Sequence, residues 1–487
     1  MRFLLINVLV LASFMQGKAQ KPSLVKNSTA ATAGYNIPIT LQPLTNCTVY
    51  IGSYFGKSMT LVDSTRLDAN SKGVFKGNKK LTGGIYFVVS PNYTLQFEVL
   101  MDDKQQFSIT GDTANKEKAF TTGSLDNDLF KQYTAFSTEK GKLRMQLEAE
   151  YKAAKTKADS TKFRDELIKI EQQMEKYREG IAQSHPNSLL TTLFNTMKRP
   201  TAPAIPIVNG KADSTYPYRF VKEHYWDDVA FNDDRILRTP FFESKVDEYY
   251  KYYVSPDPDS IIAEVNYMLL SARAGKEIYP YLLTKFTNKY INPEYMGQDK
   301  VFVYLFENYY AKGDTILLNP ASRKTITERA YSMMANQLGL AAPALNLTDT
   351  TGKNVSLYNV KAPFTLVAFW DPTCGHCKEE VPQIDSIYKA KWKALGVTIF
   401  SVNVNEKEVP AWKKFIADKK LPKEWIQVHQ LKEDRLAEER AGKPNFRQLY
   451  DIFKTPTLYL LDADKRIIAK QLSLQQFDNL ITVKLKK

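Results

Sequence analysis

Cysteine is scarce in this chain, and glycine and proline are not abundant. The 487 residues include 3 Cys, 21 Gly and 23 Pro. Three cysteines allow at most one intramolecular bridge, which excludes a disulfide-stapled scaffold. The modest glycine and proline content excludes a collagen-like chain, and 43% apolar residues exclude a mostly disordered one. After the N-terminus no stretch reaches about 18 apolar residues, so a multi-span membrane protein is excluded and no transmembrane span is expected in the mature chain.

The length and the charge narrow the remaining classes. At roughly 150 residues per domain, the length predicts about three domains. The formal net charge is +14, but the lysines and arginines are interleaved with acidic residues, and only the last four residues form a basic tip. No basic stripe accompanies aromatic platforms, so we expect a solvated surface and no nucleic-acid partner.

The N-terminus has the layout of a secretory signal peptide. Arg2 precedes an apolar run over residues 3–15, and the small residues Gly17 and Ala19 stand at the positions that a signal peptidase reads. A buried strand or a membrane anchor is the alternative, although the run is short for a bilayer. We therefore predict a signal peptide over residues 1–19 and a secreted protein.

Two regions of different periodicity follow. Residues 22–112 alternate short β-rich runs with turn residues, which predicts a small antiparallel β domain. Residues 125–335 carry apolar residues at helical spacing, which predicts an all-α middle domain. Cys47 lies in the β-rich part with no neighbouring Cys or His, so we interpret it as a half-buried, unreactive thiol.

Residues 340–487 alternate strands with helices. The run over 364–370 is continuously apolar, as a buried parallel strand should be, and 397–404 is a second such run. Residues 457–462 and 467–472 indicate a hairpin near the C-terminus. The pattern predicts an α/β domain of ordinary size.

The segment that carries chemistry joins the first of these strands to a helix. The strand ends at Trp370, and a helix begins at or near Cys374. Cys377 follows three residues later, so one helical turn brings the two sulfurs together. A helix N-terminus favours a thiolate, and His376 can add positive charge. The spacing suits thiol–disulfide exchange, in which Cys374 attacks a target and Cys377 resolves the mixed disulfide.

Other uses of a Cys-x-x-Cys pair fit less well. A zinc site needs further ligands, yet the remaining cysteine is Cys47 and His is scarce. A c-type haem site needs His directly after the second cysteine, where this chain has Lys378. A purely structural disulfide would close too small a loop to stabilise much. We therefore expect no cofactor and no metal.

The segment FTLVAFWDPTCGHCKEEVP resembles the thioredoxin superfamily, and within it the TlpA/ResA-like envelope thiol–disulfide oxidoreductases. The resemblance implies a thioredoxin fold for residues 340–487. It also implies a loop with Pro456 in cis, in which Thr455 faces the disulfide and binds substrate backbone. Glu380 matches an acidic residue that tunes proton transfer in the ResA-like branch, whereas Ala368 stands where thioredoxin has a buried Asp. By layout, the β-rich and helical parts resemble accessory domains of secreted thioredoxin-like proteins.

These observations predict a multidomain chain with three parts in order: a β domain, an all-α domain and an α/β thioredoxin fold. The predicted function is a periplasmic or cell-envelope thiol–disulfide oxidoreductase that exchanges the Cys374–Cys377 pair with client proteins. A membrane or envelope redox partner would restore the pair, and the direction of electron flow stays open. The alternatives are an envelope binding or scaffold protein for a glycan or protein ligand, and a peroxiredoxin-like peroxidase.

Overall fold

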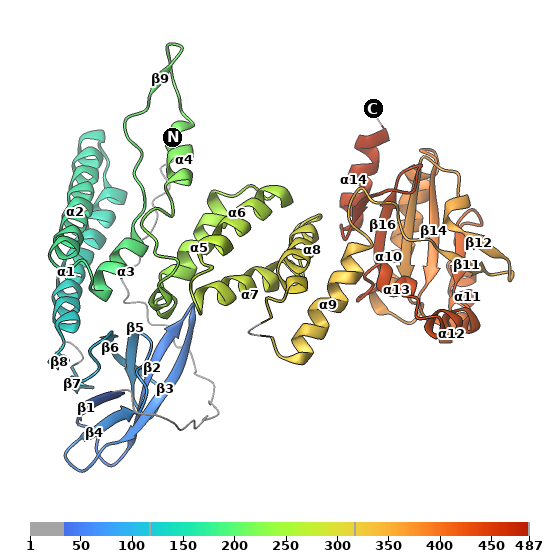
Figure 1. Cartoon of the computed structure of the whole chain (residues 1–487). Helices are drawn as coiled ribbons and strands as arrows, with labels where there is room; N and C mark the ends of the chain where they lie inside the picture. Colours follow the sequence, from blue (N-terminus) through green and yellow to red (C-terminus); the bar gives the residue numbers. More distant parts are fainter. Residues whose placement is uncertain (1–33, 116–117, 316–317, 486–487) are drawn as a thin grey trace. The chain divides into compact units, whose positions relative to one another are not determined.

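The computed structural model describes residues 34–115, 118–315 and 318–485 (Figure 1). The predicted signal peptide at 1–19 lies outside these residues. The chain forms two compact units. Unit 1 runs as far as Val254 and includes Leu270–Tyr279, whereas unit 2 comprises Ser255–Leu269 and the chain from Pro280 onward. The predicted order of β sheets, an all-α region and an α/β thioredoxin fold is confirmed. The predicted domain limits stay a prediction.

Unit 1 begins with eight strands in two four-stranded sheets, whose orders are β4-β1-β7-β8 and β3-β2-β5-β6. Most pairs are antiparallel, as predicted, but β1 and β7 pair in parallel, since these strands are joined by a long connection through the other sheet. The strands are β1 (Tyr35–Gln42), β2 (Thr48–Phe55), β3 (Ser58–Arg66), β4 (Lys72–Gly77), β5 (Gly84–Val89), β6 (Leu95–Met101), β7 (Ser108–Asp112) and β8 (Phe120–Thr122).

The two sheets close on one apolar core. Along β1, Ile37, Ile39 and Leu41 point inward at every second position and are buried. Residues of β2, β4, β5, β6 and β7 complete the same core. Cys47 is half-buried and packs against it, which is the surrounding expected for a thiol without chemical partners.

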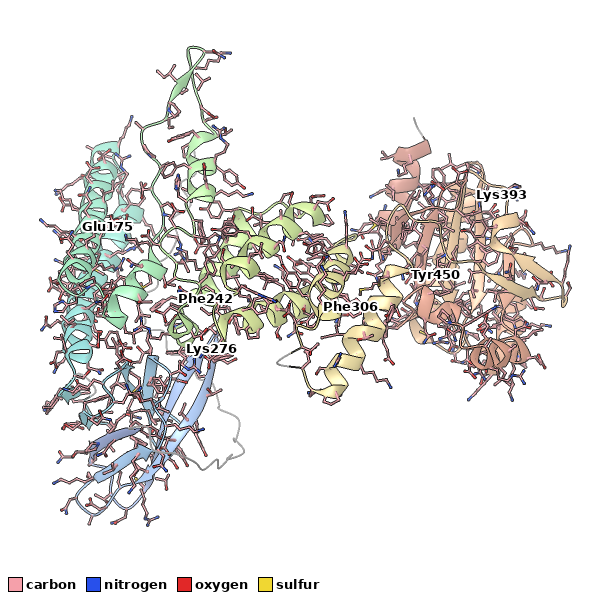
Figure 2. The ribbon with its side chains drawn as sticks, in the orientation of Figure 1. Glu175, Phe242, Lys276, Phe306, Lys393 and Tyr450 are labelled. Atoms are coloured by element: carbon pink, nitrogen blue, oxygen red, sulfur yellow. The ribbon has the colours of Figure 1, made fainter. Side chains whose placement is uncertain are left out.

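Helices make up most of the remainder of unit 1, and Phe242 is one of their buried residues (Figure 2). Ser124 and Thr156 cap the two long helices through their side-chain oxygens. A short antiparallel hairpin is formed by β9 (Ile207–Val208) and β10 (Lys211–Ala212). The helices are α1 (Leu125–Ala153), α2 (Lys157–Ser184), α3 (Leu189–Met197), α4 (Tyr216–Glu223), η2 (Asp234–Arg238) and α5 (Phe242–Tyr252).

Unit 2 contains further helices ahead of its α/β part, and buried polar contacts fasten this helical region to the α/β part. Asp299 is buried with Lys470, and their oxygen and nitrogen lie 2.6 Å apart. Lys470 also donates to the side-chain oxygen of Asn336 at 2.6 Å. The helical elements are α6 (Pro258–Ser271), α7 (Ile278–Tyr290), α8 (Asp299–Asn308), η3 (Tyr310–Lys312) and α9 (Pro320–Met334).

The α/β part of unit 2 is built on one seven-stranded sheet, in the order β12-β11-β15-β14-β13-β16-β17. β13, β14 and β15 run parallel at its centre, and β16 and β17 form the predicted hairpin beside β13. The strands are β11 (Asn346–Asp349), β12 (Asn354–Ser356), β13 (Phe364–Trp370), β14 (Val397–Asn403), β15 (Ile426–His429), β16 (Thr457–Leu461) and β17 (Ile467–Lys470).

Helices and connecting segments bury both faces of this sheet. One apolar cluster contains Trp370, Cys377 and Trp412, and the other contains Phe369, Tyr450 and Tyr459. Tyr450 is labelled in Figure 2. The central strands are therefore buried on both sides, as their continuous apolar runs predict. The helical elements are η4 (Leu357–Asn359), α10 (Gly375–Ile387), η5 (Tyr388–Trp392), η6 (Glu406–Glu408), α11 (Val409–Asp418), α12 (Lys432–Arg440), α13 (Phe446–Leu449) and α14 (Leu474–Leu485).

Candidate active site

The Cys-x-x-Cys segment lies where the central strand β13 ends and α10 begins. Asp371 forms the turn between them. Its carboxylate accepts hydrogen bonds from the backbone N–H and the hydroxyl of Thr373, both at 2.7 Å, and from the Asn405 side chain at 2.9 Å. The N–H of Cys374 donates to the Asp371 carbonyl at 3.1 Å. The turn is thus fixed, and it places Cys374 as the residue that caps α10.

Cys374 carries the more acidic of the two thiols. Its Sγ lies 3.4 Å from the carbonyl oxygen of Thr455 and can donate to it. Hydrogen bonding with the Thr455 side chain lowers the pKa of the Cys374 thiol, and the amides of Cys377 and His376 lower it further, while partial burial opposes them. Because the side chain is only half-buried, its thiolate is open to a reacting partner.

Cys377 has the opposite environment. It is buried within the apolar cluster on one face of the sheet. Burial raises the pKa of its thiol to about 12, although the Asp371 N–H, 3.5 Å from Sγ, opposes this rise. Cys377 is therefore a protonated thiol at neutral pH. Neither thiol is in a disulfide in this structure.

The Thr455-Pro456 loop reaches the cysteines from 81 residues further along the chain. The peptide bond between these residues is cis, as predicted. The Thr457 hydroxyl donates to the Lys454 carbonyl at 2.6 Å and steadies the loop. The structure thus brings three of the predicted site residues into contact, namely Cys374, Cys377 and Thr455, with Pro456 adjoining them.

The other predicted site residues lie around this contact. Burial raises the pKa of the half-buried Glu380 carboxyl, and the charges of His376 and Lys454 oppose that rise. His376 is exposed in the first turn of α10. Trp370 is buried in the same apolar cluster as Cys377, and its indole N–H donates to the Ser401 hydroxyl at 2.8 Å. We infer that Trp370 supports the site through packing.

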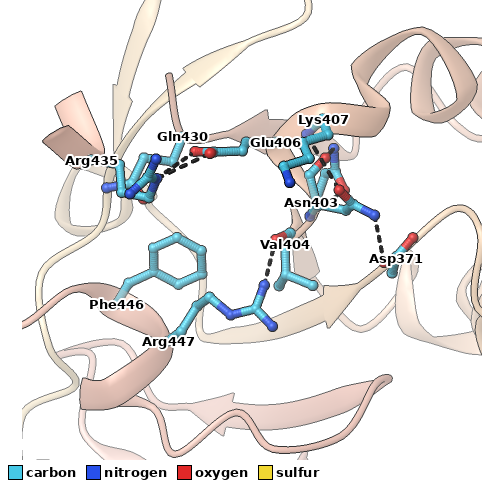
Figure 3. Close-up of a pocket in the computed structure, with 10 residues that line it drawn as sticks. Asp371, Asn403, Val404, Glu406, Lys407, Gln430, Arg435, Phe446 and Arg447 are labelled. Carbon is cyan, nitrogen blue, oxygen red and sulfur yellow. Dashed lines mark hydrogen bonds and ion pairs between the residues drawn. The ribbon is translucent and has the colours of Figure 1, made fainter. Parts of the chain in front are cut away.

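A polar pocket borders the turn at Asp371 (Figure 3). Its volume is about 460 Å³. Arg447 donates to the Val404 carbonyl at 2.6 Å, and Arg435 pairs with Glu406 at 2.9 Å across its lining. The sequence marks Asp371 as part of a turn, but neither Asp371 nor Asn405 was predicted as a site residue. The Asp-Pro-Thr sequence was a readable turn signal, whereas the contact to Asn405 joins residues 34 positions apart and left no local mark.

The described ranges contain no group of three or more His, Cys, Asp or Glu side chains that could hold a metal ion. Over the same ranges, no helix combines the length and the apolar character that a membrane crossing requires.

Two family models match separate parts of the chain. Residues 338–470 match the AhpC/TSA family, and residues 163–332 match a family described as Domain of unknown function (DUF5106). The first match covers the cysteines and the cis-proline loop. The second covers helical elements of both compact units.

Curated relatives match the C-terminal region. Thiol-disulfide oxidoreductase ResA of Bacillus cereus is 29% identical over 136 residues, which cover 28% of this chain and 69% of the relative. ResA of Bacillus subtilis is 38% identical over 71 residues, which cover 15% of this chain and 39% of the relative. Homologues thus carry the name thiol-disulfide oxidoreductase, and the thioredoxin-like fold is consistent with that activity.

Solved structures also resemble the chain. A thioredoxin-like protein from Bacteroides caccae is 23% identical, with a TM-score of 0.45, and the match covers 59% of this chain and 99% of that one. A domain of a possible thiol-disulfide isomerase from Cytophaga hutchinsonii is 36% identical, with a TM-score of 0.27, and the match covers 31% of this chain and 93% of that one.

Proposed function

We propose that the protein is a thiol–disulfide oxidoreductase acting on client proteins. Its C-terminal region is a thioredoxin-like domain that matches the AhpC/TSA family and has ResA homologues. The observation that carries the proposal is the asymmetry of the two thiols. Cys374 is half-buried with a lowered pKa, and Cys377 is buried with a raised one. An accessible thiolate beside a protected thiol is the arrangement that exchange through a mixed disulfide requires.

In the reducing direction, the Cys374 thiolate attacks one sulfur of a client disulfide. The client S–S bond breaks, a mixed disulfide forms on Cys374, and the second client sulfur leaves and takes up a proton. Cys377 then loses its proton and attacks the Cys374 sulfur, which releases the first client sulfur as a thiol. The client has gained two electrons and two protons, and the Cys374–Cys377 pair is oxidised. The oxidising direction runs the same steps in reverse.

The surrounding residues have matching roles in this proposal. Glu380 keeps its proton to a higher pH than an ordinary carboxyl, because burial raises its pKa, so it can exchange a proton with a departing or attacking sulfur. Thr455 contacts the nucleophile and, with Pro456, offers backbone to a client strand. His376 adds positive charge near Glu380.

The client class and the location form part of the same proposal. Exchange on Cys374 implies clients that contain cysteines or disulfides. The basic start and apolar run of residues 1–19 favour export to the periplasm or cell envelope. There, a membrane or envelope redox partner would return the pair to its working state.

A trapping experiment tests the mechanism. In a Cys47→Ala background, a Cys377→Ala variant should accumulate a mixed disulfide between Cys374 and a disulfide substrate such as insulin, because no internal thiol can resolve it. Nonreducing electrophoresis and mass spectrometry identify the adduct. The background protein with both active-site cysteines should show turnover and no lasting adduct.

Three outcomes separate the alternatives. Absence of the adduct together with insulin turnover by a Cys374→Ser variant contradicts the proposed roles. An unreactive Cys374–Cys377 disulfide favours the scaffold or binding function. Rapid peroxide consumption without exchange on insulin favours a peroxidase.

A further inference from the structure

Phe453 is a large apolar residue that is exposed to solvent next to the Thr455-Pro456 loop. It is 70% exposed, and it precedes Thr455, which contacts Cys374, by two residues. A single exposed apolar side chain needs no functional explanation by itself. Here, however, a second feature holds the ring in place.

That feature is Arg329 of α9, a helix that precedes the α/β part in the chain. The guanidinium carbon of Arg329 lies 4.0 Å from the centre of the Phe453 ring, a close cation–π contact. The same guanidinium donates to the Asp451 carboxylate and, at 2.9 Å, to the Ile291 carbonyl. Arg329 is thus fixed on two sides, and Phe453 stays largely exposed despite this contact.

Asp451 completes the anchor. It is buried, and its backbone has a φ of 50°, in the left-handed region. Burial raises the pKa of its carboxyl, and the charge of Arg329 opposes that rise. One guanidinium therefore contacts both Asp451 and Phe453, which precede the Thr455-Pro456 loop in the chain. Arg329 belongs to the part of the chain that matches the DUF5106 family, whereas Asp451 and Phe453 belong to the AhpC/TSA match.

We propose that Phe453 is a specificity-determining residue that contacts an apolar side chain beside the reacting cysteine of the client, and that Arg329 positions it. This inference rests on the proposed exchange function. An extended client strand rises about 3.3 Å per residue, and Phe453 is at most about 7 Å along the chain from Thr455. These two spans are comparable, so we infer that the ring meets a client side chain within two positions of the cysteine. The helical region thereby contributes to client choice through the loop that it steadies.

Two synthetic peptide disulfides test the proposal. Each is a homodimer joined through a single cysteine, and they differ only in the residues flanking it, which are leucine in one and serine in the other. The full-length protein, reduced and freed of reductant, is mixed with each peptide. The released peptide thiol gives the second-order rate constant of a single turnover.

Phe453→Ala should lower the rate constant for the leucine peptide about fivefold, because an apolar contact is lost, and should leave the serine peptide nearly unchanged. Tyr295→Ala is the matched control, since it removes a ring that is 56% exposed elsewhere in unit 2, and it should change neither rate.

Arg329→Lys keeps the positive charge but loses the planar stack. It should reduce the preference for leucine about twofold, and it should have no further effect in a Phe453→Ala background.

The readout is the ratio of the two rates, which a general loss of stability does not move. Equal losses for both peptides, or an unchanged ratio in Phe453→Ala, overturn the specificity role. An Arg329→Lys effect that persists at full size in the Phe453→Ala background overturns the positioning role. A wild-type protein that releases thiol from neither peptide overturns the exchange function itself, and this inference with it.

Discussion

The two compact units each hold a titratable group with a displaced pKa, and they differ in what can reach it. In unit 2, Cys374 has a lowered pKa and is half-buried beside the Thr455-Pro456 loop. In unit 1, Lys245 has its pKa lowered to about 7 by burial and by the charge of Arg199, yet it is only 1% exposed. A displaced pKa therefore marks a candidate site only where a substrate has access.

The surroundings of Lys245 explain its isolation. Its ammonium nitrogen donates to the Lys198 carbonyl at 2.5 Å. It lies 4.8 Å from the centre of the Tyr225 ring and 5.8 Å from that of Trp226. The aromatic faces and the carbonyl offset only part of the burial that lowers the pKa of Lys245. We interpret this cluster as packing in unit 1.

The largest expected effect is on the rate of disulfide exchange, which should depend on Cys374 and not on Lys245. Cys374→Ser should reduce disulfide exchange by about a thousandfold or more, because a hydroxyl is a far weaker nucleophile than a thiolate. Lys245→Met should leave the exchange rate within about twofold of wild type. Insulin reduction in the presence of dithiothreitol measures both. A large loss of activity in Lys245→Met with its fold retained would show that Lys245 contributes to disulfide exchange.

The next effect concerns the two thiols. At pH 7, iodoacetamide should modify Cys374 in a Cys377→Ala variant at least about a hundredfold faster than it modifies Cys377 in a Cys374→Ala variant, because Cys377 is buried with a pKa of about 12. The Cys374 rate should rise with pH, with its midpoint lower than that of an ordinary thiol, because the pKa of Cys374 is lowered. Mass spectrometry follows both reactions, with Cys47→Ala as the background. Similar rates at pH 7 would contradict the asymmetry.

A second buried lysine, in unit 2, should affect the free energy of unfolding. Lys470 is 2% exposed and is paired with Asp299, unlike Lys245. Lys470→Met leaves the Asp299 carboxylate buried without its cation and should destabilise unit 2 by about 3–5 kcal/mol. The double variant Lys470→Met, Asp299→Leu should recover most of the loss. Tryptophan fluorescence during urea unfolding reports mainly on unit 2, since Trp370, Trp392, Trp412 and Trp425 all lie there.

The smallest expected effect is on how the free energy of unfolding of unit 1 depends on pH. The pKa of Lys245 is about 7 in the folded state and about 10.4 in an unfolded chain. Between these values the unfolded state binds more protons, so this group makes the wild type more stable as pH rises, by at most about 1.4 kcal/mol per pH unit. Lys245→Met removes this dependence. Pulse proteolysis in urea at pH 7 and pH 9 measures the difference, and parallel curves for both proteins would refute the assignment.

The sequence was most informative where structure is local. The Cys374–Cys377 spacing and the strand before it follow from residues close together in the chain, and the predicted fold class is confirmed. The cis bond between Thr455 and Pro456, which the family resemblance implied, is also present. The approach of Thr455 to Cys374 came from the family resemblance, because nothing local joins residues 81 positions apart.

The contacts between regions could not be predicted. Arg329 and Asp451 are 122 residues apart, and Lys470 and Asp299 are 171 apart. Each of these charged residues looks like an ordinary surface group in its own segment. Burial and pairing depend on the complete tertiary structure, as does the parallel pairing of β1 with β7 in a sheet expected to be antiparallel.

The buried pair of Lys470 and Asp299 bears on how the thioredoxin-like region can be produced alone. A polypeptide begun at residue 338, where the AhpC/TSA match starts, keeps Lys470 and Asp451 but loses Asp299, Asn336 and Arg329. Lys470 on the edge strand β17 and Asp451 before the cis-proline loop would then lack the residues with which they form ion pairs. A fragment that starts ahead of α8 keeps each of these groups with its partner, so it is the better choice for expression and crystallisation.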